Sequence, residues 1–421
     1  MNKYFKLGCK NDILYLIKHV TKNFQGDYFY RNSFFIFLGR TLNAFSGFIF
    51  WFVATKYYTP ADIGICTALI SSLALMATYS KLGLDVSIIR FMPSNNKSSI
   101  FSTCLIINSS LNIFISAIFL MTVEIISPKM SVIQNYPLMF LGLSLFNSAT
   151  FLTGITFLAI REGKYYFFQN LLGLIRVPAL IPLARLGSLG IFLSYGISII
   201  FSAILAIYFI KKFLDIKPVF DMNFIKSSMN LSLTNYLTSI FNDTGPIISI
   251  MILNLLGPED VAFYFIATTI GVNIFLLLPD AISRSFFVEG CHGLNLRKGG
   301  IKSLSAAYIT VIPLFILIYF FGTFILNFFG TAYLEAFGLL KVYAFSSLFS
   351  VVYMIFMSIL NIKLFYKRNL ALNAGRFLMA LGFSYISIMH FGLIGAGYAW
   401  FMVEAITCLL IVYWAKKDKL V

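Results

Sequence analysis

Five ionisable residues lie inside long apolar runs of the sequence, where burying a charge is costly and usually serves a function. Three are arginines, Arg40, Arg176 and Arg376, and two are acids, Asp243 and Glu404. Because a guanidinium pairs bidentately with phosphate, the arginines predict an anion-binding ring suited to phosphate if they face a central cavity. The acids, near the middle of their runs, predict either coupling sites for Na⁺ or H⁺ or salt bridges to the arginines.

Each of these residues also has a plainer interpretation. An arginine can extend its side chain to the lipid headgroups, and a buried acid can be protonated and hydrogen-bonded to a neighbouring helix. The context of Asp243 favours function, because it lies in Asn242-Asp-Thr-Gly-Pro246. Glycine and proline there loosen a helix and free backbone carbonyls for a cation.

The sequence carries no GxSxG, HExxH, Walker A or dinucleotide-binding glycine motif. Its five cysteines and three histidines are scattered, with no spacing typical of metal ligands. We therefore expect a protein that is not an enzyme and has neither a metal nor an organic cofactor.

The elements that hold these residues are predicted to be membrane-spanning helices. Hydrophobic residues make up 59% of the 421 residues and charged residues 11%, which is too apolar for a water-soluble domain of this size. A span needs roughly 20 apolar residues, and about twelve such runs are present. They are 34–54, 61–80, 101–123, 137–160, 168–186, 189–210, 231–256, 261–279, 303–329, 336–360, 370–390 and 393–415. The sequence predicts an all-α polytopic membrane protein.

The positive charges set the orientation of these spans. With twelve spans and a cytoplasmic amino terminus, most of the 32 lysines and arginines, Lys81 among them, fall in inner loops. This distribution predicts that both termini are cytoplasmic. It also explains the net charge of +16 without nucleic acid as a partner.

Three short patterns recur in the same order after about 200 residues. Pro60 and Pro258 follow the first and seventh runs, and Arg176 and Arg376 occupy the fifth and eleventh. Leu-Gly-Ser-Leu-Gly at 186–190 matches Phe-Gly-Leu-Ile-Gly at 391–395. The recurrence predicts two parallel six-helix lobes. The expected divisions are an amino-terminal segment 1–33, a first lobe 34–210, a linker 211–230, a second lobe 231–415 and a tail 416–421.

Several segments resemble the polysaccharide-repeat-unit (O-antigen type) flippases of the multidrug/oligosaccharidyl-lipid/polysaccharide exporter (MOP) superfamily. They are Tyr-Tyr-Thr-Pro-Ala-Asp-Ile-Gly at 57–64, Lys-Leu-Gly-Leu-Asp at 81–85, Ile-Ile-Arg-Phe at 88–91 and Phe-Gly-Leu-Ile-Gly-Ala-Gly-Tyr-Ala-Trp at 391–400. The resemblance implies a V-shaped exporter in the cytoplasmic membrane, with a cationic cavity between its lobes. Its cargo would be a polyprenyl-(pyro)phosphate-linked oligosaccharide for surface polysaccharide, moved by alternating access. Arg40, Arg176 and Arg376 would bind the lipid phosphate, with membrane lipids and other glycan assembly proteins as partners.

Two alternatives remain at this point. One is a cation-coupled multidrug antiporter, a branch that usually carries acids in its first lobe. Asp243 and Glu404 are in the second lobe, which argues against it. The other is a membrane scaffold or a glycan polymerase, and the short outer loops argue against a polymerase.

Overall fold

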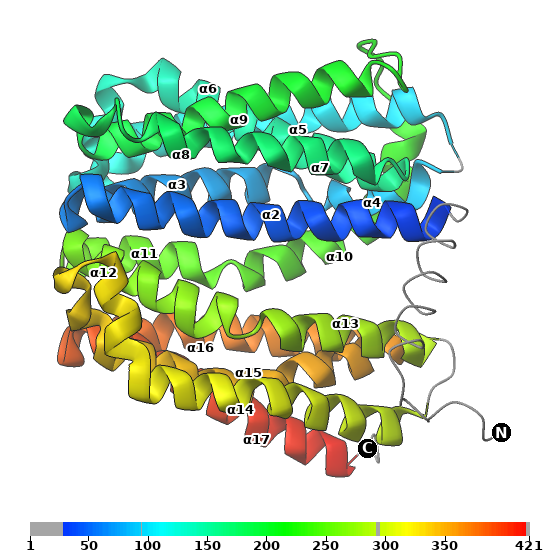
Figure 1. Ribbon diagram of the computed structural model, residues 1–421. Helices are drawn as coiled ribbons and strands as arrows, with labels where there is room; N and C mark the ends of the chain where they lie inside the picture. Colours follow the sequence, from blue (N-terminus) through cyan, green and yellow to red (C-terminus); the bar gives the residue numbers. More distant parts are fainter. Residues whose placement is uncertain (1–27, 94, 292–294, 418–421) are drawn as a thin grey trace, which may run out of the picture.

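The computed structural model describes residues 28–93, 95–291 and 295–417, so the predicted segments 1–33 and 416–421 lie mostly outside it (Figure 1). The described residues form helices and no strand. The first-half helices are α2 (Tyr28–Tyr57), α3 (Pro60–Ser80), α4 (Leu84–Phe91), α5 (Lys97–Ile126), α6 (Pro137–Ala159), α7 (Gly163–Leu171), α8 (Arg176–Ala179) and α9 (Ser188–Ile210). The second-half helices are α10 (Met222–Asn242), α11 (Thr244–Leu255), α12 (Pro258–Thr268), α13 (Leu277–Cys291), α14 (Leu296–Phe329), α15 (Phe337–Ile362), α16 (Tyr366–Phe391) and α17 (Leu393–Lys417).

Ten helices in the described part of the chain are long and apolar enough to cross a membrane. They account for ten of the predicted spans, and the remaining two, 168–186 and 231–256, are present as broken helices. The prediction of an all-α polytopic membrane protein with about twelve spans is confirmed.

Both broken crossings have a cause in the sequence. In the first, α7 gives way after Leu171 to 3₁₀ turns and the four-residue α8, and Pro178 and Pro182, which have no backbone N–H to donate, prevent this segment from continuing as a regular α-helix. In the second, Asp243 separates α10 from α11 with φ −88° and ψ 49°, and Pro246 lies in the first turn of α11. The loosened helix predicted at Asn242-Asp-Thr-Gly-Pro246 is therefore observed.

Helix α10 begins well before the predicted span because Asp221 caps it. The Asp221 carboxylate accepts hydrogen bonds from the Phe224 backbone N–H at 2.9 Å and from the Ser99 hydroxyl at 3.0 Å. These donors, the Phe224 N–H above all, hold the pKa of Asp221 below its ordinary value. The same residue thus starts α10 and ties the preceding linker to α5.

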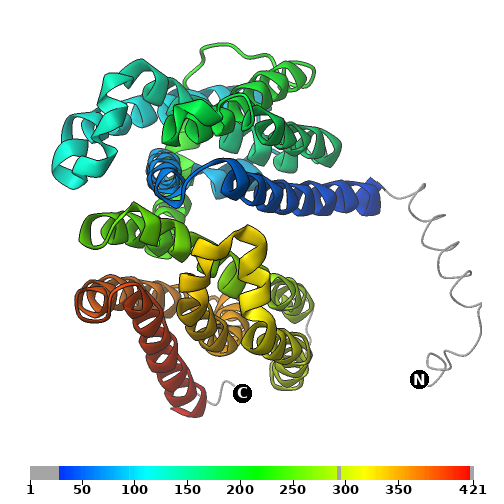
Figure 2. The ribbon, with the colours of Figure 1, turned by 60° about the vertical axis from the view of Figure 1, so that its left-hand side comes forward.

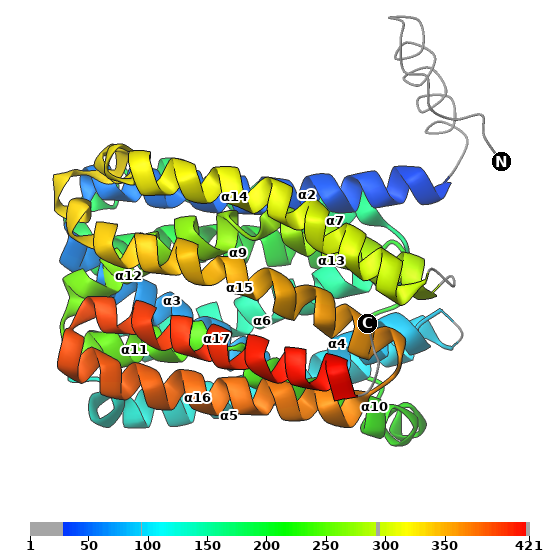
Figure 3. The ribbon, with the colours of Figure 1, turned by 90° about the horizontal axis from the view of Figure 1, so that it is seen from below.

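The two halves of the chain gather on opposite sides of the molecule, with α10 and α11 between them (Figures 1 and 2). Viewed from below, α14, α15, α17 and α16 of the second half lie side by side (Figure 3). Helix α2 begins and α17 ends at the same end of the bundle, which we call the inner end (Figure 1). The opposite end is called the outer end. The loop charges predict that the inner end faces the cytoplasm.

The sequence repeat is also a structural repeat. Gly187 and Gly392 both have positive φ, at 56° and 62°, just before α9 and α17. Gly190 and Gly395 are matched as well, since a Cβ on either would lie 2.1 Å from a backbone carbonyl oxygen, of Leu183 and Ser387 respectively. The two closing hairpins are therefore built in the same way.

At the outer end the two halves are in direct contact. A Cβ added to Gly64 of α3 would lie 1.6 Å from the Pro258 carbonyl oxygen at the start of α12. The Lys129 ammonium donates to the Leu253 carbonyl at 2.9 Å, and the Asn254 amide donates to the Ile126 carbonyl at 2.6 Å. These contacts close the molecule at its outer end.

Replacing Gly64 by alanine should open the outer end, because the new methyl group would overlap the Pro258 carbonyl. In a cysteine-free background, spin labels at Asn135 and Ala332 in the outer turns report the separation by pulsed EPR. We expect a longer distance in the Gly64→Ala variant. Gly142→Ala is the matched control, since a Cβ there meets nothing within 4 Å. An unchanged distance in the Gly64 variant would show that this contact does not hold the outer end closed.

Candidate functional site

The second half contains two adjoining cavities, of about 190 Å³ and 350 Å³. They share Asn242, Thr244, Val272 and Trp400, and apart from Ser71 of α3 every lining residue belongs to the second half. We call this space the second-half cavity.

Irregular helices shape this cavity. The break at Asp243 places Asn242 and Thr244 on its wall, and the π-helix Thr269–Ile274, between α12 and α13, adds Val272 and Asn273. Regular α-helices in these places would form more backbone hydrogen bonds within each helix and would leave a smaller cavity between the helices. Helices α15, α16 and α17 complete the wall.

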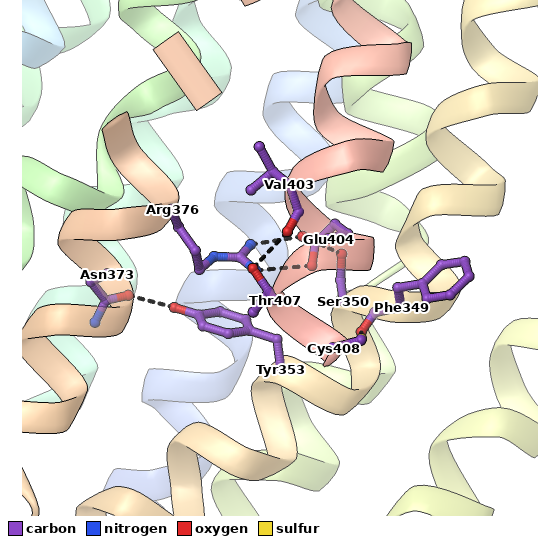
Figure 4. Close-up of polar contacts among 9 residues, drawn as sticks. All are labelled: Phe349, Ser350, Tyr353, Asn373, Arg376, Val403, Glu404, Thr407 and Cys408. Carbon is purple, nitrogen blue, oxygen red and sulfur yellow. Dashed lines mark hydrogen bonds and ion pairs between the residues drawn. The ribbon is translucent and has the colours of Figure 1, made fainter. Parts of the chain in front are cut away.

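Arg376 and Glu404 form a bidentate ion pair on this wall (Figure 4). Nη1 of Arg376 lies 3.0 Å from Oε2 of Glu404, and Nη2 lies 2.7 Å from Oε1. Arg376 is 8% exposed and Glu404 is fully buried. The salt bridge predicted as one alternative for the acids is therefore present for Glu404.

Neighbouring side chains hold this ion pair in place. The Ser350 hydroxyl donates to Oε1 of Glu404 at 2.8 Å. The Tyr353 ring lies under the guanidinium, with its centroid 3.7 Å from Cζ of Arg376 (Figure 4). Its hydroxyl donates to the Asn373 amide oxygen at 2.6 Å. Charge, hydrogen bonds and aromatic stacking thus all stabilise one rotamer of Arg376.

The first-half counterpart, Arg176, has no such partner. Its Nη2 donates to the Ser46 hydroxyl at 3.0 Å, and its guanidinium lies 5.3 Å from the Phe50 ring and 5.8 Å from the Tyr195 ring. Its buried Nε has no hydrogen-bond partner. Within the described residues, no carboxylate forms an ion pair with it.

The structural repeat explains this difference. Tyr195 and Trp400 are equivalent by the register of the closing hairpins, and each ring lies 5.8 Å from its arginine. In the same register Glu404 corresponds to Ile199, which is buried and apolar. Both copies of the repeat therefore contain the arginine, but among the described residues only Arg376 has a carboxylate partner.

Among the described residues, Arg40 and Asp243 contact neither Arg176 nor the Arg376–Glu404 pair. Arg40 is exposed on α2 and makes no hydrogen bond or ion pair in the described part of the chain. Asp243 forms a hydrogen bond with Thr78 near the end of α3, with Lys81 close by. The three predicted arginines are not joined by any contact among the described residues, and Asp243 is paired with none of them.

Lys81 lies in a loop between helices, as expected, but its side chain is largely covered. It lies at the turn between α3 and α4, with a side chain only 15% exposed, and forms an ion pair with Asp85 at 3.5 Å. The turn is buried because Gly83 packs directly on the backbone of α10, at Ser232 and Tyr236. Thr78, Lys81, Asp85 and Asp243 together form a polar cluster between α3, α4 and the α10–α11 break, which we call the seam cluster.

Sequence reasoning missed the residues that surround Arg376. Helical spacing was the available signal, because residues three, four or seven apart share a face. Asn369, Asn373 and Arg376 follow this spacing on α16, as do the pairs Ser350–Tyr353 on α15 and Trp400–Glu404 on α17. Polar and aromatic residues on one face of an apolar span indicate a buried site.

Solved structures similar to this chain are transporters. The lipid II flippase MurJ, in an inward closed conformation, has a TM-score of 0.72 at 15% identity, over 91% of this chain and 87% of that one. An inward-facing multidrug resistance MATE family transporter of the MOP superfamily has a TM-score of 0.68 at 14% identity, over 91% and 94%. The chain has the fold of the MOP-superfamily transporters. No protein-family model and no curated protein sequence matches it.

An outward-facing MATE family transporter of the MOP superfamily is also similar in fold, with a TM-score of 0.60 at 12% identity, over 93% of this chain and 95% of that one.

Proposed function

We propose that this protein is a flippase that moves a polyprenyl-(pyro)phosphate-linked oligosaccharide across the cytoplasmic membrane by alternating access, for surface polysaccharide synthesis. The observation that carries the proposal is Arg176, a half-buried guanidinium whose buried Nε has no hydrogen-bond partner and which has no carboxylate partner among the described residues. A charge in that position is stabilised by an anion and would repel a cationic drug. The phosphate of a lipid carrier is such an anion, and guanidinium groups bind it well.

The similarity to a lipid II flippase supports the proposal, because that protein is also named for a lipid-linked cargo. Arg40 and Arg376 keep supporting roles in it. Arg40 is exposed on the helix that also carries Ser46, and its free guanidinium is available to a phosphate that approaches Arg176. Arg376 is already neutralised by Glu404, so we expect it to position the cavity wall rather than to bind phosphate.

The second candidate function is a cation-coupled multidrug antiporter. The seam cluster favours it, because one lysine faces two carboxylates there and leaves an excess negative charge. The MATE-family structures among the similar folds point the same way.

Transport by the purified protein in proteoliposomes distinguishes the two functions. One set of vesicles carries a polyprenyl pyrophosphate that bears a fluorescent disaccharide. A membrane-impermeant quencher reaches only the lipid in the outer leaflet, so the fluorescence that remains measures the lipid in the inner leaflet. A second set measures uptake of the cationic dye rhodamine 6G. We expect protein-dependent movement of the lipid-linked sugar and no dye uptake. Dye uptake without lipid movement would establish the antiporter instead.

Asp243 is proposed to couple transport to Na⁺ or H⁺. It lies where a helix is broken and where the two halves meet at Thr78 and Lys81, so loading it with a cation changes the charge of the seam cluster. Asp243→Asn should leave the movement of lipid-linked sugar equally fast with and without an ion gradient, whereas the wild type is accelerated by one. The control is Glu289→Gln, an exposed acid at the inner end. A variant that still responds to the gradient would exclude this role.

A further inference from the structure

We propose that the second-half cavity binds the uncharged sugar units of the substrate, while Arg176 in the first half binds its phosphate. This inference rests on the proposed function and assigns the two chemical parts of the cargo to different halves. It is argued from the charge, the free hydrogen-bonding groups, the aromatic lining and the position of the cavity.

The cavity carries no free charge that would select an ion. Among the residues that the structure describes, Arg376 and Glu404 are the only charged ones that line it, and both oxygens of Glu404 accept hydrogen bonds from Arg376. A phosphate would have to displace Glu404 from Arg376, and a cation would have to displace Arg376 from Glu404. Either exchange breaks a buried ion pair, which is strongly unfavourable. An uncharged polar ligand leaves the ion pair intact.

Polar groups on the wall are nevertheless left without partners. Asn242 and Asn273 are exposed and make no hydrogen bond within the described residues. The indole Nε1 of Trp400 is buried and has no partner either. Two amides and an indole offer several donors and acceptors. A bound ligand rich in hydroxyl groups would pair with the two amides in place of water and would satisfy the buried indole N–H, which is costly to leave unpaired.

Aromatic rings line the cavity as well, and a sugar site needs such rings in addition to polar groups. Trp400 lines both cavities, with Phe241, Tyr353 and Phe377 in the smaller one and Tyr264, Phe265 and Tyr343 in the larger one. A pyranose ring has an apolar face of C–H groups that packs on an aromatic ring, while its hydroxyls at the rim reach amides. The larger cavity, at about 350 Å³, falls within the range of small-molecule sites, roughly 300–1,000 Å³.

Two core rings separate the cavity from Arg176. The Arg176 guanidinium is 5.3 Å from the Phe50 ring, and Phe50 and Trp51 are 5.0 Å apart. Trp51 in turn is 4.7 Å from Phe265, which lines the larger cavity from the second half. Because Phe50 and Trp51 are buried, a substrate with its phosphate on Arg176 must extend its sugar chain past these rings to reach the cavity across the seam between the halves.

Binding to the full-length protein in nanodiscs tests the assignment. The two radiolabelled probes are bare polyprenyl pyrophosphate and the same carrier bearing an uncharged disaccharide that contains N-acetylglucosamine. We expect the disaccharide to tighten binding to the wild type by roughly tenfold or more, the contribution of one or two good polar contacts. Trp400→Leu and Asn273→Ala should each remove most of this gain and leave the affinity for the bare carrier unchanged. Trp400→Phe, which keeps an aromatic face, should retain most of it.

The outcomes separate this inference from the proposed function. Equal affinity of the wild type for both carriers would overturn the sugar assignment alone, as would a Trp400→Leu variant that weakens both carriers equally. Binding of rhodamine 6G that depends on Trp400 would assign the cavity to a cation instead. Failure of either carrier to bind the wild type would overturn the proposed function, and the sugar assignment with it. Arg176→Gln is the matched comparison, because it should weaken both carriers by the same factor.

Discussion

Replacing Glu404 by alanine should destabilise the protein by about 3–5 kcal/mol, the typical cost of removing one partner from a buried ion pair. Glu404 is fully buried, and its two oxygens accept from both terminal nitrogens of Arg376. Without it, the Arg376 charge stays in a cavity wall beside the Tyr353 and Trp400 rings, and no other carboxylate among the described residues pairs with it. Reversible unfolding in mixed detergent, followed by circular dichroism, measures the free-energy difference.

The double variant Arg376→Met with Glu404→Leu is the control for this prediction. It removes both charges and keeps apolar volume, so it should recover most of the stability lost in Glu404→Ala. If the double variant is as unstable as the single one, the loss comes from packing of α16 against α17 rather than from a stranded charge. A Glu404→Ala variant as stable as the wild type would contradict the prediction outright.

Arg176→Gln should slow the movement of a lipid-linked sugar by roughly 10–100-fold, the effect of losing a hydrogen-bonded charge worth about 1.5–3 kcal/mol. Glutamine keeps a donor toward Ser46 and a side chain of moderate length, so the main change is the loss of the positive charge. Fluorescence protection in proteoliposomes measures the rate. Because no carboxylate pairs with Arg176 among the described residues, the variant should unfold at the same detergent fraction as the wild type.

Two further variants serve as controls for the Arg176 prediction. Arg176→Lys restores the charge but not the planar fork, and should recover part of the rate. Arg376→Gln, made at the equivalent site in the repeat, should lower stability through an unpaired Glu404. Normal transport by Arg176→Gln in protein of normal abundance would contradict the assignment of the phosphate to Arg176.

The fold was predictable from the sequence because it depends on simple regularities. Three of these regularities depend only on the order of residues along the chain. They are the long apolar runs, the concentration of lysines and arginines in alternate loops, and the recurring glycines. The break at Asp243 was predictable for the same reason, since Gly245 and Pro246 follow it in sequence. Even the matched positive φ angles of Gly187 and Gly392 come from positions that the repeat had singled out.

The candidate site was less predictable because it depends on which helices meet. Arg376 and Glu404 were recognised separately, but their pairing requires that α16 and α17 present them to each other. The difference between Arg176 and Arg376 lies in Ile199, an apolar residue that nothing in the sequence marks as functional. Lys81 lies in a turn, as its position at the end of an apolar run predicted, but its burial was not predictable because it depends on Gly83 bringing α10 close enough to cover it.

The two broken crossings also bear on how the chain enters the membrane during synthesis. Ten helices of the described chain are long and apolar enough to leave a translocation channel one by one as they emerge from the ribosome. The segments around α8 and around Asp243 are interrupted, and their free backbone groups are tolerated in lipid only where protein covers them. We expect each of these segments to wait at the channel until its neighbours, α9 in the first case and α12 in the second, have been made. Assembly of the two halves would then depend on the pace of translation at these two points.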